Sequence, residues 1–125
     1  MEVTIQLGDE EFAATLEEEL APETVQAIEE ALPLEGSASM WGDEIYFTIP
    51  VDVKPENGVE TVSVGDLAYW PEGNAFCIFY GKTPMSRSEE EIVPASAVNP
   101  IGRIQGAERV KEHRAGEMVR VEEAE

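Results

Sequence analysis

Every second residue is apolar in several stretches of this chain, which is the pattern of β-strands that turn one face to a core. The pattern occurs in residues 3–7 (VTIQL) and again in residues 12–16 (FAATL), with Gly8 between them. Two strands joined by a tight turn fit this arrangement. The chain therefore begins with a predicted antiparallel hairpin.

A strong helical pattern is found in one place. Pro22 suits the first turn of a helix, Pro33 cannot continue one, and apolar residues recur at helical spacing between them. We therefore predict a helix over residues 22–32. A second, short helix is expected at residues 107–113, before Gly116.

The other strand-like stretches are short and are separated by Gly and Pro clusters. They cover residues 36–41, 44–49, 67–70, 75–80, 98–104 and 117–121. Many short strands with one amphipathic helix are typical of an antiparallel barrel or sandwich, and a closed barrel leaves no exposed strand edge. The fold class is predicted as mainly β. The two long loops, residues 50–66 and 81–97, are the expected location of binding residues.

A length of 125 residues is typical of one domain, so we expect residues 1–125 to fold as a unit. No apolar run approaches the roughly 20 residues of a membrane span, and the N-terminus lacks a basic region followed by an apolar stretch. A cytoplasmic protein is the expectation. Cys77 is the only cysteine, which excludes an internal disulfide, and its apolar neighbours favour a buried structural thiol over a catalytic one.

Acidic residues outnumber basic residues by 27 to 8, which gives a formal net charge of -19. A field of this sign repels phosphate groups, so neither nucleic acid nor an anionic membrane is expected as a partner. The charge has two interpretations: an ordinary solvated surface, or adaptation to a salt-rich cytoplasm that screens self-repulsion. A melting temperature that rises with potassium chloride would favour the second.

The pattern of ligand-forming side chains does not predict a metal site. His113 is the only histidine, and the acids do not follow the spacing of a calcium-binding loop. We expect no metal and no cofactor, and the sequence assigns a catalytic role to no residue.

Eight of the nine aromatic residues fall within residues 41–47 and 69–80. Aromatic side chains supply large contact areas both in cores and in ligand pockets. In the predicted strand 75–80 (AFCIFY) both faces are apolar. A strand of this kind needs a partner sheet or a ligand against its outer face.

Four segments together resemble the small prokaryotic cyclophilin-like proteins. They are residues 41–47 (WGDEIYF), 65–71 (GDLAYWP), 79–86 (FYGKTPMS) and 94–102 (PASAVNPIG). The resemblance covers nearly the whole chain and implies the cyclophilin fold, a closed eight-stranded barrel with one or two capping helices. It implies no particular substrate, because a fold by itself does not determine function.

Cyclophilins themselves are peptidyl-prolyl isomerases, and a weak ungapped likeness to them extends over residues 73–83. Their essential arginine, aligned through the Ile-Pro that follows it, falls at Phe47, and no arginine occurs before Arg87. Loss of the guanidinium that stabilises the transition state should remove much of the rate. The resemblance therefore disfavours ordinary isomerase activity.

The alternation in residues 44–49 conflicts with this alignment. It places Phe47 on the core face and Glu44 and Tyr46 on the outer face, and a shift of one residue would exchange the faces. On the basis of the alternation we predict a ligand-binding groove on the outer surface. Its predicted residues are Trp41, Glu44, Tyr46, Trp70, Phe79, Thr83 and Met85.

The leading functional hypothesis is a binding module that holds a small molecule or an extended peptide in this groove. The alternative is an atypical prolyl isomerase without the arginine. A third interpretation is that the aromatic residues form a surface for a homo-oligomer, and a monomeric scattering profile across concentrations would count against it.

Overall fold

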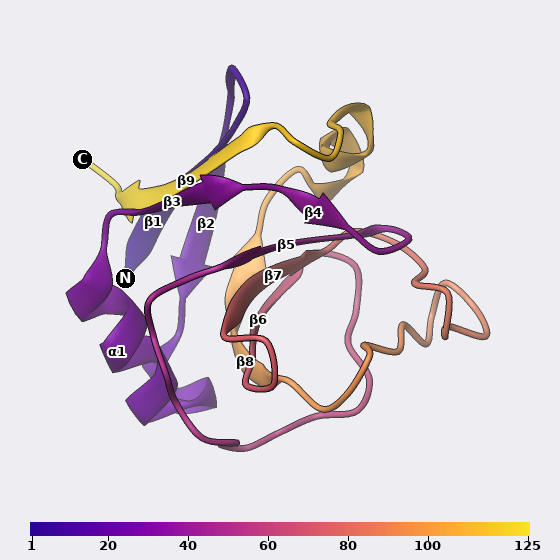
Figure 1. The fold of residues 1–125 in the computed structure, drawn as a ribbon, viewed down its shortest axis with the longest axis horizontal. Coiled ribbons are helices and arrows are strands. Elements are labelled where there is room, and N and C mark those ends of the chain that lie inside the picture. The colour runs from indigo at the N-terminus through magenta and orange to yellow at the C-terminus, as the bar shows by residue number, and fades with distance from the viewer.

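Nine strands form one antiparallel sheet that curls into a nearly closed barrel in the computed structural model, which describes residues 1–125 (Figure 1). The strands are β1 (Glu2–Leu7), β2 (Glu10–Leu16), β3 (Leu34–Ser37), β4 (Ser39–Met40), β5 (Glu44–Thr48), β6 (Asp66–Trp70), β7 (Ala75–Phe79), β8 (Asn99–Ile104) and β9 (Met118–Glu123). The mainly β fold predicted from the sequence is confirmed.

The barrel closes through the segment that contains β3 and β4. The strand order is β3-β9-β1-β2-β8-β6-β7-β5-β4, so β3 and β4 lie at its two ends. Only Ala38 separates them in the chain, and its backbone N–H donates to the carbonyl of Glu117 at 2.8 Å. When β3 and β4 are counted as one bent strand, the barrel has the eight strands that the resemblance implied.

The helices lie close to their predicted positions. Helix α1 (Pro22–Ala31) ends one residue before the prediction, and the predicted short helix is the 3-10 helix η2 (Ala107–Glu112). A further 3-10 turn, η1 (Glu18–Leu20), precedes α1. None of the helices combines the length and the apolar character needed to cross a membrane.

The N-terminus of α1 is capped by a residue from a distant loop. Ala21, at the N-cap, has no side chain that can accept a hydrogen bond, and the Glu56 carboxylate instead accepts from the backbone N–H groups of Glu23 at 3.0 Å and Thr24 at 2.8 Å. The buried Asn99 on β8 accepts from the backbone N–H of Glu56 at 2.9 Å and donates to the Thr24 hydroxyl at 3.0 Å. The loop between β5 and β6 is therefore tied to both the helix and the barrel.

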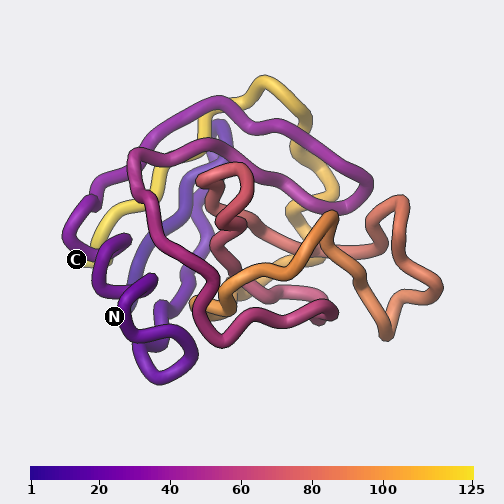
Figure 2. The backbone as a smooth tube through the Cα atoms, turned by 60° about the horizontal axis from the view of Figure 1, so that its bottom comes forward, coloured from indigo at the N-terminus to yellow at the C-terminus, as the bar shows by residue number.

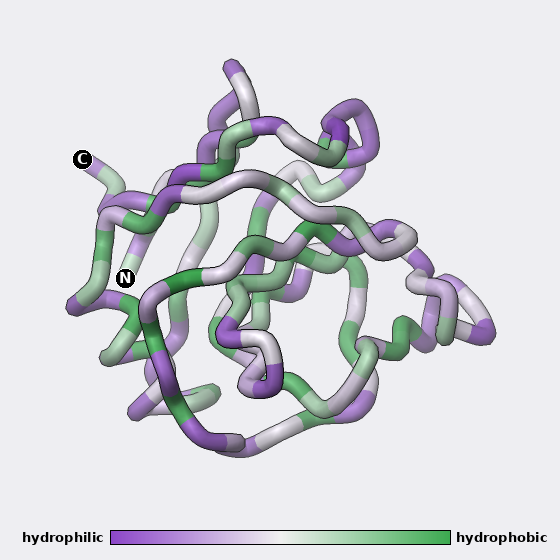
Figure 3. The backbone as a smooth tube through the Cα atoms, viewed as in Figure 1, coloured by the Kyte–Doolittle hydropathy of each residue, from purple (hydrophilic) through white to green (hydrophobic).

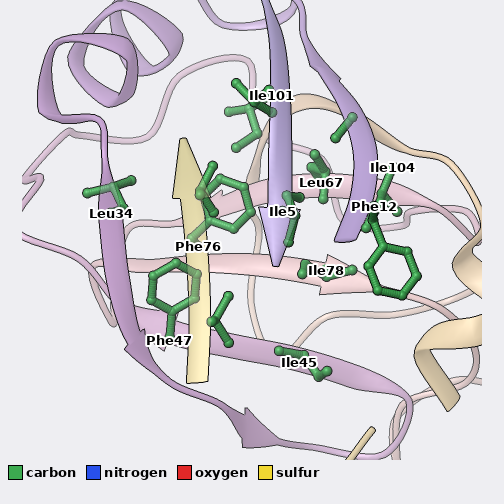
Figure 4. Close-up of a cluster of buried hydrophobic side chains, with 14 of the residues drawn as sticks. Ile5, Phe12, Leu34, Ile45, Phe47, Leu67, Phe76, Ile78, Ile101 and Ile104 are labelled. Carbon is green, nitrogen blue, oxygen red and sulfur yellow. The ribbon is translucent and has the colours of Figure 1, made fainter. Parts of the chain in front are cut away.

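The barrel interior holds the main hydrophobic core, a cluster of 25 buried residues to which strands around the barrel and α1 contribute (Figure 4). On β5, the predicted alternation is observed, because Ile45 and Phe47 point into this core and Ile49 follows them inside. The rings of Phe47 and Phe76 pack with centroids 5.6 Å apart. Hydrophilic residues gather at the tips of the β1–β2 hairpin and of the segment between β7 and β8 (Figure 3).

Candidate functional site

Strand β7 is buried on both faces, which defines the layer in which the candidate site lies. Phe76 and Ile78 point into the barrel core, whereas Cys77 and Phe79 belong to a second cluster of 7 buried residues on the outer side of the sheet. No second sheet covers this outer face. The strand pattern predicted a partner sheet or a ligand there, and the structure instead shows a cover made by loops.

The cover comes from the two long loops, between β5 and β6 and between β7 and β8. Each loop supplies apolar side chains to the outer cluster, and isolated bridges pair Val59 with Val98 and Val62 with Ile92. In Figure 2 the end of the β7–β8 loop, in orange, lies beside the β5–β6 loop, in magenta, whereas the earlier part of the β7–β8 loop projects to the right. The outer cluster is thus closed by backbone pairing as well as by apolar contact.

A cavity of about 210 Å³ opens where this cover is incomplete. It lies over the outer face of β5 and β6, next to the end of the loop that leads into β8. Its lining residues are Trp41, Glu44, Tyr46, Trp70, Pro94, Ala95 and Val98. We call this cavity the aromatic pocket.

The turn between β4 and β5 holds Trp41 and Glu44 in the lining of the aromatic pocket. Gly42 has φ +60, a conformation that favours glycine, and a Cβ there would lie 2.8 Å from the carbonyl oxygen of Lys82. The backbone N–H of Trp41 donates to the carbonyl of Glu44 at 3.0 Å, and that of Asp43 donates to Lys82 at 2.8 Å. The turn is therefore held against the segment that follows β7.

The aromatic walls are also held in place. The rings of Tyr46 on β5 and Trp70 on β6 have centroids 6.2 Å apart and planes at 77°. The indole N–H of Trp70 donates to the hydroxyl of Ser96 at 2.6 Å, which links the wall to the loop before β8. Tyr46 and Trp70 also pack against the outer cluster, so the rings have a fixed base.

Glu44 carries the one carboxyl group in the lining, and it is only 6% exposed. Burial raises the pKa of its carboxyl to about 7, and the neighbouring Cys77 thiol acts in the opposite direction. Burial, together with the charge of Glu44, in turn raises the pKa of the Cys77 thiol. At neutral pH the Glu44 carboxyl therefore exchanges between its neutral and charged forms, while Cys77 is a buried free thiol as predicted.

Four of the seven predicted groove residues line the aromatic pocket: Trp41, Glu44, Tyr46 and Trp70. Phe79 does not line it, because it is fully buried within the outer cluster. Thr83 is buried as well, and its hydroxyl bonds to Ser86 and to the carbonyl of Val93, so it organises its own loop.

Met85, the seventh predicted residue, is 53% exposed and lies outside the aromatic pocket. It lines a separate surface hollow of about 320 Å³, to which Pro94 and Ala95 also contribute. The segment 94–95 therefore forms a ridge between the aromatic pocket and this hollow. Pro94, Ala95 and Val98 were not among the predicted groove residues: only their position in a long loop pointed to Pro94 and Ala95, and Val98 was expected at the start of a strand.

No cluster of three or more His, Cys, Asp or Glu side chains is placed to hold a metal ion. No arginine, lysine or histidine lines the aromatic pocket. The chemistry available there is apolar contact, aromatic faces, one carboxyl group and one phenol.

A family model described as Cyclophilin-like matches residues 1–122. The chain belongs to the cyclophilin-like family. The solution structure of a hypothetical protein from Archaeoglobus fulgidus is similar to this cyclophilin-like chain at 50% identity, with a TM-score of 0.84, and the match covers 99% of this chain and 95% of that one. No match is found among curated proteins. Membership of this family shows the fold, but a fold by itself does not determine what the aromatic pocket binds.

Proposed function

We propose that this protein is a binding module that takes a small organic group into the aromatic pocket. The observation that carries the proposal is that side chains from three separate segments line one cavity. They come from residues 41–46, from Trp70 on β6 and from the loop before β8. A concave, mainly apolar site with a few polar groups is the usual form of a ligand site. A volume of about 210 Å³ fits a small ligand, or one side chain of a peptide.

The first test is a ligand screen by thermal shift on the wild-type protein, followed by Trp70→Ala. Removing the indole opens one wall, and we expect the affinity for any hit to fall at least about tenfold, or about 1.4 kcal/mol. Met85→Ala is the control, because Met85 lies across the ridge and its loss should leave a small ligand bound. Hits that bind Trp70→Ala as well as wild type would contradict the proposal.

The same pair of variants separates a small molecule from an extended peptide. A peptide that crosses the ridge formed by Pro94 and Ala95 would contact both the aromatic pocket and the hollow beside Met85. Met85→Ala would then weaken the peptide and leave the small molecule unaffected. Unfolding curves of both variants without ligand establish that each is folded.

Prolyl isomerase activity is the alternative that the family membership raises. Against it, Phe47, which the cyclophilin alignment places at the arginine, is 2% exposed inside the barrel, and the aromatic pocket contains no guanidinium. We expect no acceleration of prolyl isomerisation in a protease-coupled assay at micromolar protein. Clear acceleration that Trp70→Ala abolishes would support the isomerase instead.

A further inference from the structure

Three aromatic side chains form the walls of the aromatic pocket in an arrangement suited to a positively charged group. Tyr46 and Trp70 pack edge to face with their planes at 77°, and Trp41 adds a third ring to the lining from the β4–β5 turn. The faces of aromatic rings carry partial negative charge and attract cations, most strongly for tryptophan. Two of the three rings here are indoles.

The carboxyl group of Glu44 has no cationic partner within the protein. Every salt bridge of the chain involves other residues, and no basic side chain lines the aromatic pocket. The titratable groups near Glu44 are Asp43 on the same turn, Tyr46 on β5, Cys77 on β7 and Tyr80 after β7, and none of them is a base. An ionised Glu44 is therefore an uncompensated buried charge, and a bound cation would neutralise it.

The charge of the whole protein acts in the same direction. A net charge of -19 raises the local concentration of cations and repels anions from a concave site. An anionic ligand would have to overcome both this field and Glu44. A cation gains from both.

The lining also favours an alkylated ammonium group over a bare one. A primary ammonium presents three N–H donors that point in different directions, whereas the only side-chain oxygens in the lining belong to Glu44 and Tyr46, which are both on β5. The other lining side chains are apolar or aromatic, and N-methyl groups can pack against them without needing hydrogen bonds. A metal ion finds too few ligands here.

We infer that the aromatic pocket recognises an N-methylated ammonium cation, with Glu44 as its counter-ion. This inference rests on the proposed function and names the ligand class of that same site. The head group could belong to a free small molecule or to a methylated lysine side chain of a peptide, since both present the same chemistry to the aromatic pocket.

The experiment compares choline with 3,3-dimethylbutan-1-ol, which has the same shape but no charge. Trp41 and Trp70 are the only two tryptophans and both line the aromatic pocket, so intrinsic fluorescence reports directly on the site. At pH 8 and constant ionic strength, we expect choline to bind at least tenfold more tightly than its isostere. Glu44→Gln should reduce this preference for choline over its isostere at least tenfold.

The pH dependence gives an independent readout. Because the Glu44 pKa is about 7, the fraction of charged carboxylate rises between pH 6 and pH 8, and choline should bind more tightly over that range. A ligand that accepts a hydrogen bond from the neutral carboxyl would show the opposite trend. Glu44→Gln should remove the pH dependence.

Two further probes distinguish the sources of the head group. A short peptide that contains trimethyl-lysine will bind more tightly than choline if flanking peptide contacts add affinity. The same peptide with an unmodified lysine is its control. Equal affinities of choline and the trimethylated peptide would show that the head group of a free small molecule is sufficient for binding. Both results support the inference, and tighter binding of the unmodified lysine peptide contradicts it.

The failure of this inference can be told apart from failure of the proposed function. If the isostere binds as tightly as choline and Trp70→Ala weakens both, the aromatic pocket is a ligand site but the cationic ligand class is wrong. If neither probe changes the fluorescence, the inference is overturned, and the proposed function then depends on the thermal-shift screen alone.

Discussion

Replacing Gly102 with alanine is expected to lower the free energy of unfolding by about 3 kcal/mol or more. A Cβ at this position would lie 1.9 Å from the backbone carbonyl oxygen of Thr15, which no rotation of a side chain can relieve. Strands β2 and β8 pair here, Leu16 with Gly102 and Thr15 with Arg103. The two strands would have to separate, and the barrel would lose pairing where β2 meets β8.

Thermal unfolding followed by circular dichroism measures this effect. For a chain of this size, a loss of about 3 kcal/mol corresponds to a fall in Tm of roughly 10 °C. Gly58→Ala is the matched control, because a Cβ there would lie 3.6 Å from the Ala97 side chain and 3.9 Å from the Val98 carbonyl oxygen, both ordinary contacts. Similar stabilities of the two variants would show that β2 and β8 do not approach as closely as described.

Replacing Glu44 with glutamine is expected to stabilise the protein relative to wild type, and this stabilisation should be larger at alkaline pH than at acidic pH. The folded-state pKa of Glu44 is about 7 and the ordinary value is 4.5, so between these pH values the unfolded chain releases a proton that the folded chain retains. Wild-type stability therefore falls as pH rises through this range, and glutamine removes that loss. The difference between variant and wild type should grow by about 3 kcal/mol from pH 4 to pH 8.

Chemical denaturation at a series of pH values provides the measurement. The other carboxyl groups titrate in both proteins, so the difference between the two curves isolates Glu44. Glu72→Gln removes the same charge from an exposed turn after Trp70 and controls for net charge. A difference that stays flat from pH 4 to pH 8 would mean that the Glu44 carboxyl is already ionised and solvated.

This stability cost bears on the function proposed above. A carboxyl group that is buried without a basic partner weakens the folded state at neutral pH, whereas glutamine at the same place would not. Ionisable groups with strongly shifted pKa values gather at functional sites. Glu44 therefore fits a site residue better than it fits a residue that supports the barrel.

The sequence predicted the barrel well because strands with one buried face have a period of two. The alternation in β5 placed Phe47 in the core and Glu44 and Tyr46 outside. It was more reliable than the match of the cyclophilin Ile-Pro to residues 49–50, which put Phe47 in a groove. The break at Ala38 was not predicted, since residues 36–41 were expected to form one strand. Nothing in the local spacing marks the point where the chain passes from β3 at one end of the sheet to β4 at the other.

The candidate site was less predictable, because alternation shows which face a residue occupies and not what covers that face. Phe79 has the same orientation as a groove residue, yet Ile92 and Val98 fold over the cluster to which it belongs. Thr83 was interpreted as a polar groove residue, whereas its hydroxyl bonds within its own loop. Both misplacements follow from contacts between segments that are distant in sequence.

Closure of the barrel through Leu34–Met40 restricts how another chain can approach this protein. A sheet with a long free edge can recruit an extended peptide, or a second copy, by adding it as another strand. Here both ends of the sheet belong to the same bent segment, so the barrel offers no long edge for such an addition. Strand addition is therefore not open to a partner of this protein, which leaves contacts made by side chains such as those that line the aromatic pocket.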